Sequence, residues 1–318
     1  MIWFLARRIG VGIVVLVVLS AASFFFFASR TDQYQGHALW PQYWTWLKGI
    51  WGGSSLHPLG GTITVALERT LMLLGYSLVL VTVIGIALAV VATLFRGSTL
   101  DLLLRAFSYL AWGIPSFLVA LLIQQLLNLN GTGHGVGPFP IAGWPGSCPA
   151  GLGIDAGTIR PCAAAGAGFT YAINVLRYLT FPALTLALGF VGYHARQLRS
   201  ALIDTLGSPY ILTARAKGLS EIRIVLRHAL RGSMVTFAAG LLSDFGAIFG
   251  AALAVDYIFK LRGLGSLFIA LFPQNGPGIL NVYAFQLILM LTAVFVIVSS
   301  LLAELAVVAL DPRIRAQP

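Results

Sequence analysis

The sequence predicts an all-α membrane protein with six transmembrane helices. Of its 318 residues, 58% are hydrophobic and only 9% are charged, whereas soluble domains carry about 25% charged residues. The mean hydropathy is +0.89, and apolar runs of about 20 residues, long enough to cross a bilayer, recur along the chain. Lys and Arg gather in the connections on one side of these runs, as the positive-inside rule describes.

The apolar runs predict the six spans in order. The first run follows Arg7 and Arg8, is long enough to cross a bilayer and lacks a clear cleavage site, so we expect an uncleaved helix rather than a secretory signal. Trp and Tyr prefer the membrane–water interface, so Tyr43–Leu47 predicts a short amphipathic helix at the surface. The expected spans cover residues 9–28, 70–95, 102–127, 178–197, 234–254 and 282–310.

These spans divide the chain into two units. Residues 1–69 hold the first helix and an external interfacial segment, and residues 70–318 hold the other five helices, an external loop at 129–176 and a polar loop at 208–231. With the N-terminus inside, thirteen Lys and Arg residues fall on the inner side and seven on the longer outer connections. Both termini and the polar loop are therefore expected in the cytoplasm.

Charge and cysteine placement exclude several other classes of protein. The net charge of +10 does not indicate nucleic-acid binding, because the basic residues form no groove-sized run. Cys148 and Cys162 are either unrelated small residues or a disulfide, which requires an oxidising compartment. The glycine-rich run at 131–137 lacks the Lys-Ser/Thr and the preceding strand of a phosphate-binding loop, and no Cys/His spacing indicates zinc.

The polar loop carries five of the chain's Lys and Arg residues, within Pro209–Arg231. Pro209 is suited to the first position of a helix, and Gly218 predicts its end at a positive φ. A second helix is expected over Glu221–Arg231, with Ser220 as a possible N-cap. An ordinary basic cytoplasmic loop would explain the charge alone, but it would not need a glycine between two helices.

Here the sequence resembles a known family. Thr213–Ser220 followed by Leu226–Arg231 resembles the coupling-loop signature of ATP-binding-cassette importer permeases, in particular the dipeptide/oligopeptide/nickel branch. The departures lie mainly on the expected outer face, where the long loop at 129–176 differs and a Pro-Gly-Asp turn is absent near residues 30–35, so they bear on receptor contact and substrate. Further similar segments are Leu102–Arg105, Gly113–Phe117, Phe181–Leu188, Asp256–Phe259, Gly263–Gly265 and Leu310–Arg315.

The resemblance implies a heterodimer of two six-span permeases, two cytoplasmic ATPase subunits and an external substrate-binding protein. The chain has no G-x-x-x-x-G-K-[ST] motif, so ATP and Mg²⁺ are expected on the partners and the chain itself is not expected to be an enzyme. The loop would dock into an ATPase and transmit its closure to the spans. The residues expected to couple are Tyr210, Thr213, Ala214, Arg215, Ala216, Lys217, Gly218, Leu219, Ser220, Glu221 and Arg227.

Polar residues inside the expected spans are candidates for the translocation path, because charges are costly in a membrane. Asp244 either faces the lumen, where it would meet a peptide's amino end or a cation, or is a paired structural carboxylate. Gln124 and Gln286 either line the path or hydrogen-bond between helices. We further expect Asp256 at a helix end, Glu304 near the inner boundary, His194 and His228 on the cytoplasmic side, and helix kinks at Pro115 and Pro182.

The function expected from these features is a permease subunit of an ABC importer for di- or oligopeptides in a bacterial or archaeal plasma membrane. A nickel chelate or another small solute is an alternative substrate. An ion-coupled secondary transporter is a second alternative, but it would need midplane carboxylates and usually internal repeats. An intramembrane enzyme is disfavoured, because no nucleophile–base motif is present.

Overall fold

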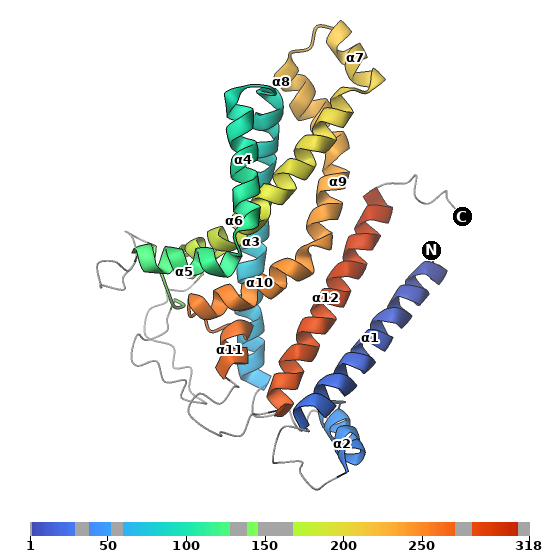
Figure 1. Cartoon of the computed structure of the whole chain (residues 1–318), viewed down its shortest axis with the longest axis vertical. Helices are drawn as coiled ribbons and strands as arrows, with labels where there is room; N and C mark the ends of the chain where they lie inside the picture. The colour runs from blue at the N-terminus through green and yellow to red at the C-terminus, as the bar shows by residue number, and fades with distance from the viewer. Residues whose placement is uncertain are drawn as a thin grey trace.

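The computed structural model describes residues 2–28, 38–51, 60–127, 139–145, 168–270 and 282–310. All regular secondary-structure elements in these ranges are helices, and Figure 1 shows their arrangement. In chain order the helices are α1 (Ile2–Ala28), α2 (Leu39–Trp51), α3 (Gly60–Leu94), α4 (Thr99–Gly113), α5 (Ser116–Leu127), α6 (Phe169–Leu206), α7 (Pro209–Ala216), α8 (Glu221–Arg223), the π-helix η2 (Ile224–Ala229), α9 (Leu230–Ser243), α10 (Phe245–Ile258), α11 (Leu264–Ala270) and α12 (Val282–Leu310).

Three of these helices, α1, α3 and α6, are long and apolar enough to cross a membrane alone. Two bent pairs, α4 with α5 and α9 with α10, bring the number of spans in the described residues to as many as five. Within α12, Ile288–Leu302 forms a shorter apolar helix. The all-helical membrane fold expected from the sequence is confirmed. The domain boundary expected between residues 69 and 70 falls inside α3.

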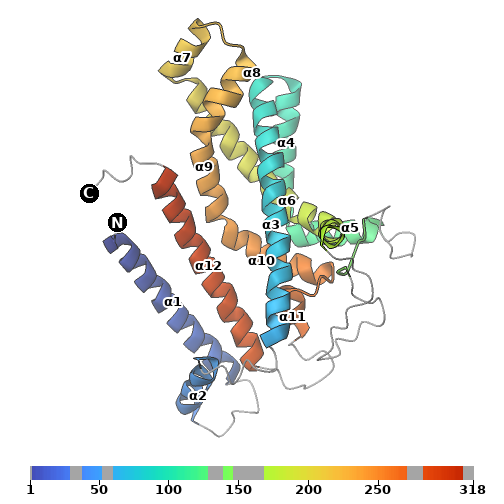
Figure 2. The ribbon, with the colours of Figure 1, turned by 180° about the vertical axis from the view of Figure 1, so that it is seen from behind.

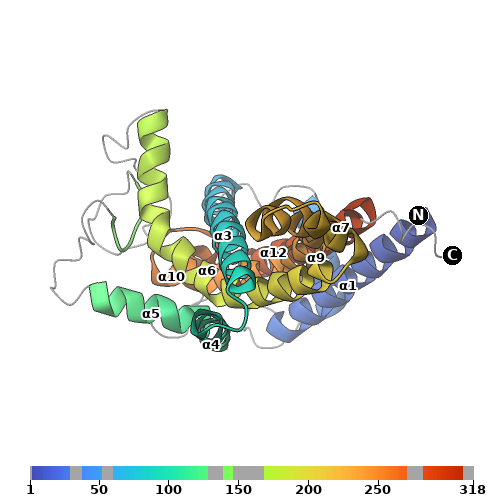
Figure 3. The same ribbon diagram turned by 90° about the horizontal axis from the view of Figure 1, so that it is seen from above.

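The kink expected at Pro115 is confirmed, and it divides the span expected over 102–127 into two helices. The chain leaves the helix at Ile114, whose backbone is extended, and α4 and α5 meet at 97°. Pro115 explains the break, because proline lacks an N–H and disfavours the helical conformation of the residue before it. Figure 3 also shows a change of direction along α6, which contains the expected kink residue Pro182.

The span expected over 234–254 is also interrupted. Asp244 separates α9 from α10, whose axes differ by 49°. The expected span over 178–197 is too short, because α6 runs for 38 residues. The more polar C-terminal half of α6 is also helical, and Leu198 and Leu202 are fully buried there. A hydropathy pattern alone does not reveal such a polar extension of a span.

Helix α6 is the centre of the fold. It packs against α3, α4, α5, α9 and α10, as Figure 2 shows from behind. The main buried cluster joins α3, α6 and α10 through residues such as Leu73, Leu186 and Phe249. Gly192 allows α6 to approach α4 closely, because a Cβ at this position would lie 2.2 Å from the carbonyl oxygen of Ser108.

The first two helices form a satellite cluster with α12. Helix α1 packs on α12 and α2, and Phe24 of α1 is buried against Tyr43 and Trp46 of α2. The hydroxyls of Ser20 and Tyr43 lie 2.7 Å apart. The helix expected over Tyr43–Leu47 is therefore confirmed as part of α2. Its aromatic residues differ in burial, since Tyr43 and Trp46 are buried and Trp44 is exposed.

Candidate functional site

The loop at 208–231 forms a small protrusion at one end of the molecule, where Figure 1 shows α7 beyond the tip of α4 and α8 beside that tip. Ser208 has the extended backbone of an N-cap residue, and Pro209 occupies the first helical turn of α7 as expected. Ile211 and Ala214 of α7 are buried against Ile224, and Leu206 and Leu219 complete the cluster. The protrusion therefore has an apolar core of its own.

Gly218 ends α7 with φ +74°, as the sequence predicts. The amide of Gly218 donates to the carbonyl of Arg215 at 2.9 Å, and the amide of Leu219 donates to that of Ala214 at 3.4 Å. These two bonds and the left-handed residue form a Schellman motif, which satisfies carbonyls at the end of a helix. The motif turns the chain back so that Leu219 packs on the cluster under α7.

An ion pair closes the same turn from outside. Arg215 donates to Glu221 through Nε at 2.7 Å and through Nη2 at 3.2 Å, and both side chains are exposed. The hydrogen bond to Glu221 raises the pKa of Arg215 above its ordinary value. The pair spans Gly218 and links α7 to α8.

We expect a small effect from breaking this pair. Arg215→Ala removes an exposed ion pair, and such pairs contribute about 0–1 kcal/mol. The apparent unfolding temperature of the purified assembly should therefore change by less than about 2 °C, as measured by a thermal-shift assay. Glu221→Gln serves as the partner variant, and a large loss of stability in either one would contradict this reading of the turn.

The separate second helix expected over Glu221–Arg231 is wrong in one respect. Helix α8 continues through η2 directly into α9, because no proline lies between Glu221 and Ser243. Ser220 stands at the N-cap position, but its side chain makes no capping hydrogen bond. A displacement of α7 and α8 would therefore act on α9 without an intervening hinge loop.

The structure exposes most of the residues that the sequence assigns to coupling. Ala214 is buried in the loop core and Leu219 is half-buried. Apolar Leu212, Ile222 and Leu226 are also exposed on the protrusion. The exposed coupling candidates are Tyr210, Thr213, Arg215, Ala216, Lys217, Gly218, Ser220, Glu221 and Arg227.

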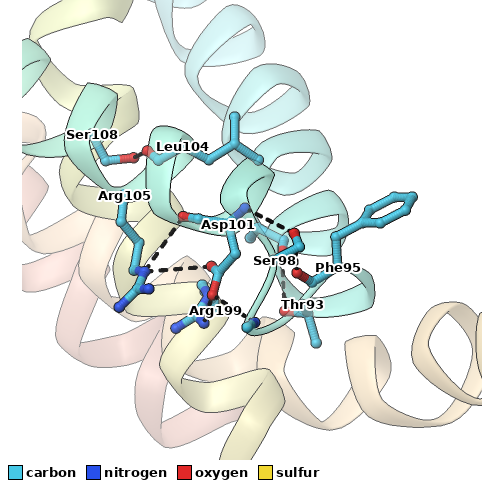
Figure 4. A network of polar contacts seen from close by, with 10 residues as sticks. Thr93, Phe95, Ser98, Asp101, Leu104, Arg105, Ser108 and Arg199 are labelled. Carbon is cyan, nitrogen blue, oxygen red and sulfur yellow. Dashed lines mark hydrogen bonds and ion pairs between the residues drawn. The ribbon is translucent and has the colours of Figure 1, made fainter.

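A buried carboxylate joins the α3–α4 turn to α6, as Figure 4 shows. Asp101 is almost fully buried and accepts hydrogen bonds from Arg199 Nη2 at 2.9 Å and from the amide of Gly97 at 3.2 Å. Arg105 Nε lies 3.5 Å from its second oxygen, and Ser98 caps α4 by accepting from the amide of Asp101. Sequence reasoning missed this network, although an aspartate between apolar runs was a signal for it.

The candidates for the translocation path are not brought together. Asp244 sits at the α9–α10 break with its carboxylate oxygen 3.5 Å from His194 Nε2. Gln124 donates to the carbonyl of Ile141 at 3.2 Å, so it holds α5 to the segment at 139–145. Gln286 is fully buried, and its amide has no hydrogen-bond partner among the described residues.

His194 and His228 differ in burial. His194 is fully enclosed between Tyr193 and Phe237, because its position on α6 faces α9 rather than the surface. His228 is half-buried in η2. Cys148 and Cys162 lie outside the described residues, as does the side chain of Glu304. Within the ranges that the structure describes, no group of three or more His, Cys, Asp or Glu could hold a metal ion.

Asp256 is a helix-end residue, as expected, and it organises the turn before α11. Its carboxylate accepts from the amides of Gly263 at 2.9 Å and Ser266 at 2.7 Å. Thr70 of α3 accepts from the amide of Leu264 at 2.9 Å, and Arg69 donates to the carbonyl of Leu261. This turn therefore ties α10 and α11 to α3.

Loss of the Asp256 charge should weaken this turn. Asp256→Asn keeps one acceptor oxygen but removes the charge that strengthens both bonds, and we expect a loss of about 1–3 kcal/mol. The measurement is the apparent unfolding temperature of the purified assembly. Asp204→Asn, at an exposed position of α6, is the matched control, and equal behaviour of the two variants would contradict the role assigned to Asp256.

Comparisons with known proteins agree with this architecture. A protein of Brucella suis biovar 1 (strain 1330) whose name describes a peptide permease is 29% identical over 283 residues, which cover 86% of this chain and 79% of that relative. The dipeptide transport system permease protein DppB of Lactococcus lactis subsp. cremoris (strain MG1363) is 30% identical over 293 residues, covering 87% of this chain and 81% of its own.

The fold is also similar to that of a solved transporter. The inward-facing MetNI methionine ABC transporter matches with a TM-score of 0.57 and 16% identity, over 80% of this chain and 98% of that one. Residues 82–316 match the family described as binding-protein-dependent transport system inner membrane component. With the apolar helices, this match makes the chain an integral protein of the bacterial plasma membrane. The chain therefore belongs to the family of binding-protein-dependent transport system inner membrane components.

Proposed function

We propose that the chain forms half of the translocation path of an ATP-driven importer for di- and oligopeptides. Membership of the binding-protein-dependent family supports the importer, and the names of the relatives, a peptide permease and a dipeptide permease, support the substrate class. A second, similar permease subunit would supply the other half of the path. An external binding protein would deliver the peptide.

The loop at 208–231 is the site through which ATP hydrolysis would drive the path. The observation that carries this proposal is the exposed α7–Gly218–α8 protrusion, which has its own core and runs directly into α9. Two cytoplasmic ATPase subunits would hold ATP and Mg²⁺, and their closure would displace the protrusion as a rigid body. Because α9 and α10 belong to one bent pair, the displacement would reach Asp244 at their junction.

The proposed orientation places the loop and both termini in the cytoplasm. Helix α1 begins, and α12 ends, on the side of the molecule nearer to α7 (Figure 1), which supports an even number of spans. The positive-inside distribution of Lys and Arg supports the same direction. We propose six spans, with α12 as the sixth and each bent pair counted as one.

The test is reconstitution of the chain with its partner permease, ATPases and binding protein in proteoliposomes. We expect uptake of radiolabelled di-alanine that requires ATP on the side of the membrane that carries the ATPases. Uptake should stop when the ATPases are omitted. Uptake driven by an ion gradient without ATPases would identify a secondary transporter instead. Uptake of a nickel chelate or another solute, with none of di-alanine, would overturn the substrate class.

A further inference from the structure

The junction between α9 and α10 leaves a charged side chain available to a ligand. The backbone of Asp244 is satisfied, since its amide donates to Gly240 at 3.0 Å and its carbonyl accepts from Ile248 at 2.9 Å. Its side chain is 35% exposed. Among the described residues, no Lys or Arg lies within ion-pair distance of it. A carboxylate at a helix break within a membrane protein, with no Lys or Arg beside it, is costly unless something satisfies it.

His194 faces this carboxylate from α6. Its side chain is 0% exposed, and its ring is held between Tyr193, at a centroid distance of 5.2 Å, and Phe237, at 5.9 Å. Both ring nitrogens are enclosed, and the side chain of Gln197 lies within hydrogen-bonding reach of the ring. The contact of 3.5 Å with Asp244 is longer than a charge-assisted hydrogen bond of about 2.7–2.9 Å, so it leaves the carboxylate unsaturated.

The other charged groups of α6 do not compensate Asp244. The guanidinium of Arg196 lies over the ring of Tyr109 at 4.1 Å, and Arg199 is bonded to Asp101. Gln197 is half-buried, its Oε1 is enclosed, and its side chain lies within hydrogen-bonding reach of His194. Gln197 sits so close to α9 that a Cβ on Gly240 would lie 2.3 Å from that oxygen. The junction therefore gathers an enclosed imidazole, the half-buried amide of Gln197 and a partly exposed carboxylate.

We infer that Asp244, oriented by His194, binds the ammonium group of a peptide during its passage. An ammonium group donates three hydrogen bonds and carries a charge opposite to that of the carboxylate. Asp244 would contact the ligand, whereas His194 is a positioning residue. The inference rests on the proposed function, because it names the chemical group of the substrate that the path recognises.

The experiment measures binding to the detergent-purified complex of both permeases and ATPases, without the binding protein, by isothermal titration. The probes are di-alanine, N-acetyl-di-alanine, which lacks the α-ammonium group, and Nα-acetyl-lysine amide, which carries only a side-chain ammonium. We expect di-alanine to bind at least about tenfold more tightly than its acetylated form. Binding of Nα-acetyl-lysine amide would show that either source of the ammonium serves.

Variants assign the preference to named residues. Asp244→Asn should bring the affinity ratio of free to acetylated peptide close to one, while Glu68→Gln, an exposed charge loss on α3, should keep the ratio. His194→Leu should reduce the ratio, and His194→Gln, which retains a donor, should restore most of it. A structural role for His194 would lower the amount of complex without changing the ratio in the complex that remains.

Two results would overturn the inference. One is equal or absent binding of di-alanine and its acetylated form by the unaltered complex, which decides the matter even when Asp244→Asn fails to assemble. The other is an undiminished preference in Asp244→Asn. Neither result contradicts the importer function, because ATP-driven uptake in proteoliposomes is measured independently. Absence of that uptake with the unaltered complex would instead contradict the proposed function.

Discussion

Replacing Gly218 with valine is expected to suppress ATP-driven uptake while the protein still reaches the membrane. Gly218 has φ +74°, and a left-handed backbone costs an L-residue about 1–2 kcal/mol, more for a β-branched one. That cost lowers the population of the folded turn by about 5–30-fold. The Schellman bonds of Gly218 and Leu219 would be lost, so α7 would no longer be held over Ile224. Uptake at matched membrane levels is the measurement.

A Gly218→Asn variant distinguishes an effect on the turn from an effect on the docking surface. Asn tolerates positive φ much better than valine, and a Cβ at Gly218 would meet no atom of the described chain within 4 Å. Gly218→Asn therefore keeps the turn but adds a side chain to the exposed surface. Loss of uptake in both variants would identify surface contact with an ATPase, and loss in valine alone would identify turn geometry. Normal uptake in both would contradict a coupling role.

Local backbone chemistry explains why this turn could be predicted from the sequence. Pro209 and Gly218 each have a restricted or special conformation, so they mark the two ends of α7 wherever it packs. The continuity of α8 with α9 could not be predicted, because a polar helix and an apolar helix look separate in a hydropathy pattern. The same limit applies at Pro115, which predicts a break but not the 97° between α4 and α5.

Contacts between distant helices were beyond sequence reasoning for a different reason. Asp244 was recognised as a costly charge, but nothing in the sequence shows that His194 of α6 faces it. Gln124 and Gln286 had the same polar character, yet one bonds to the carbonyl of Ile141 and the other is enclosed. Which face of a long apolar helix is buried depends on its neighbours, and the pairing follows only from their packing.

Removing the carboxylate of Asp101 is expected to destabilise the assembly strongly. Asp101→Ala would leave the guanidinium of Arg199, 17% exposed, without its partner and the amide of Gly97 without an acceptor. Breaking a buried ion pair on one side costs about 3–5 kcal/mol. The apparent unfolding temperature and the amount of protein in the membrane should both fall. Arg105→Ala is the control, because Arg105 is 44% exposed and such pairs contribute at most about 1 kcal/mol.

A double variant distinguishes a lost ion pair from a general disturbance of α4. Asp101→Leu with Arg199→Met replaces both charges by apolar groups, and such replacements are often neutral for stability. We expect the double variant to recover most of the stability that Asp101→Leu alone loses, which a double-mutant cycle would report as coupling of about 0.5–3 kcal/mol. Additive losses, or an Asp101→Ala variant as stable as Arg105→Ala, would show that the contact does not hold α4 to α6. Because α6 leads directly into the loop at 208–231, recovered stability without recovered uptake would assign Asp101 and Arg199 a part in transmitting the motion as well.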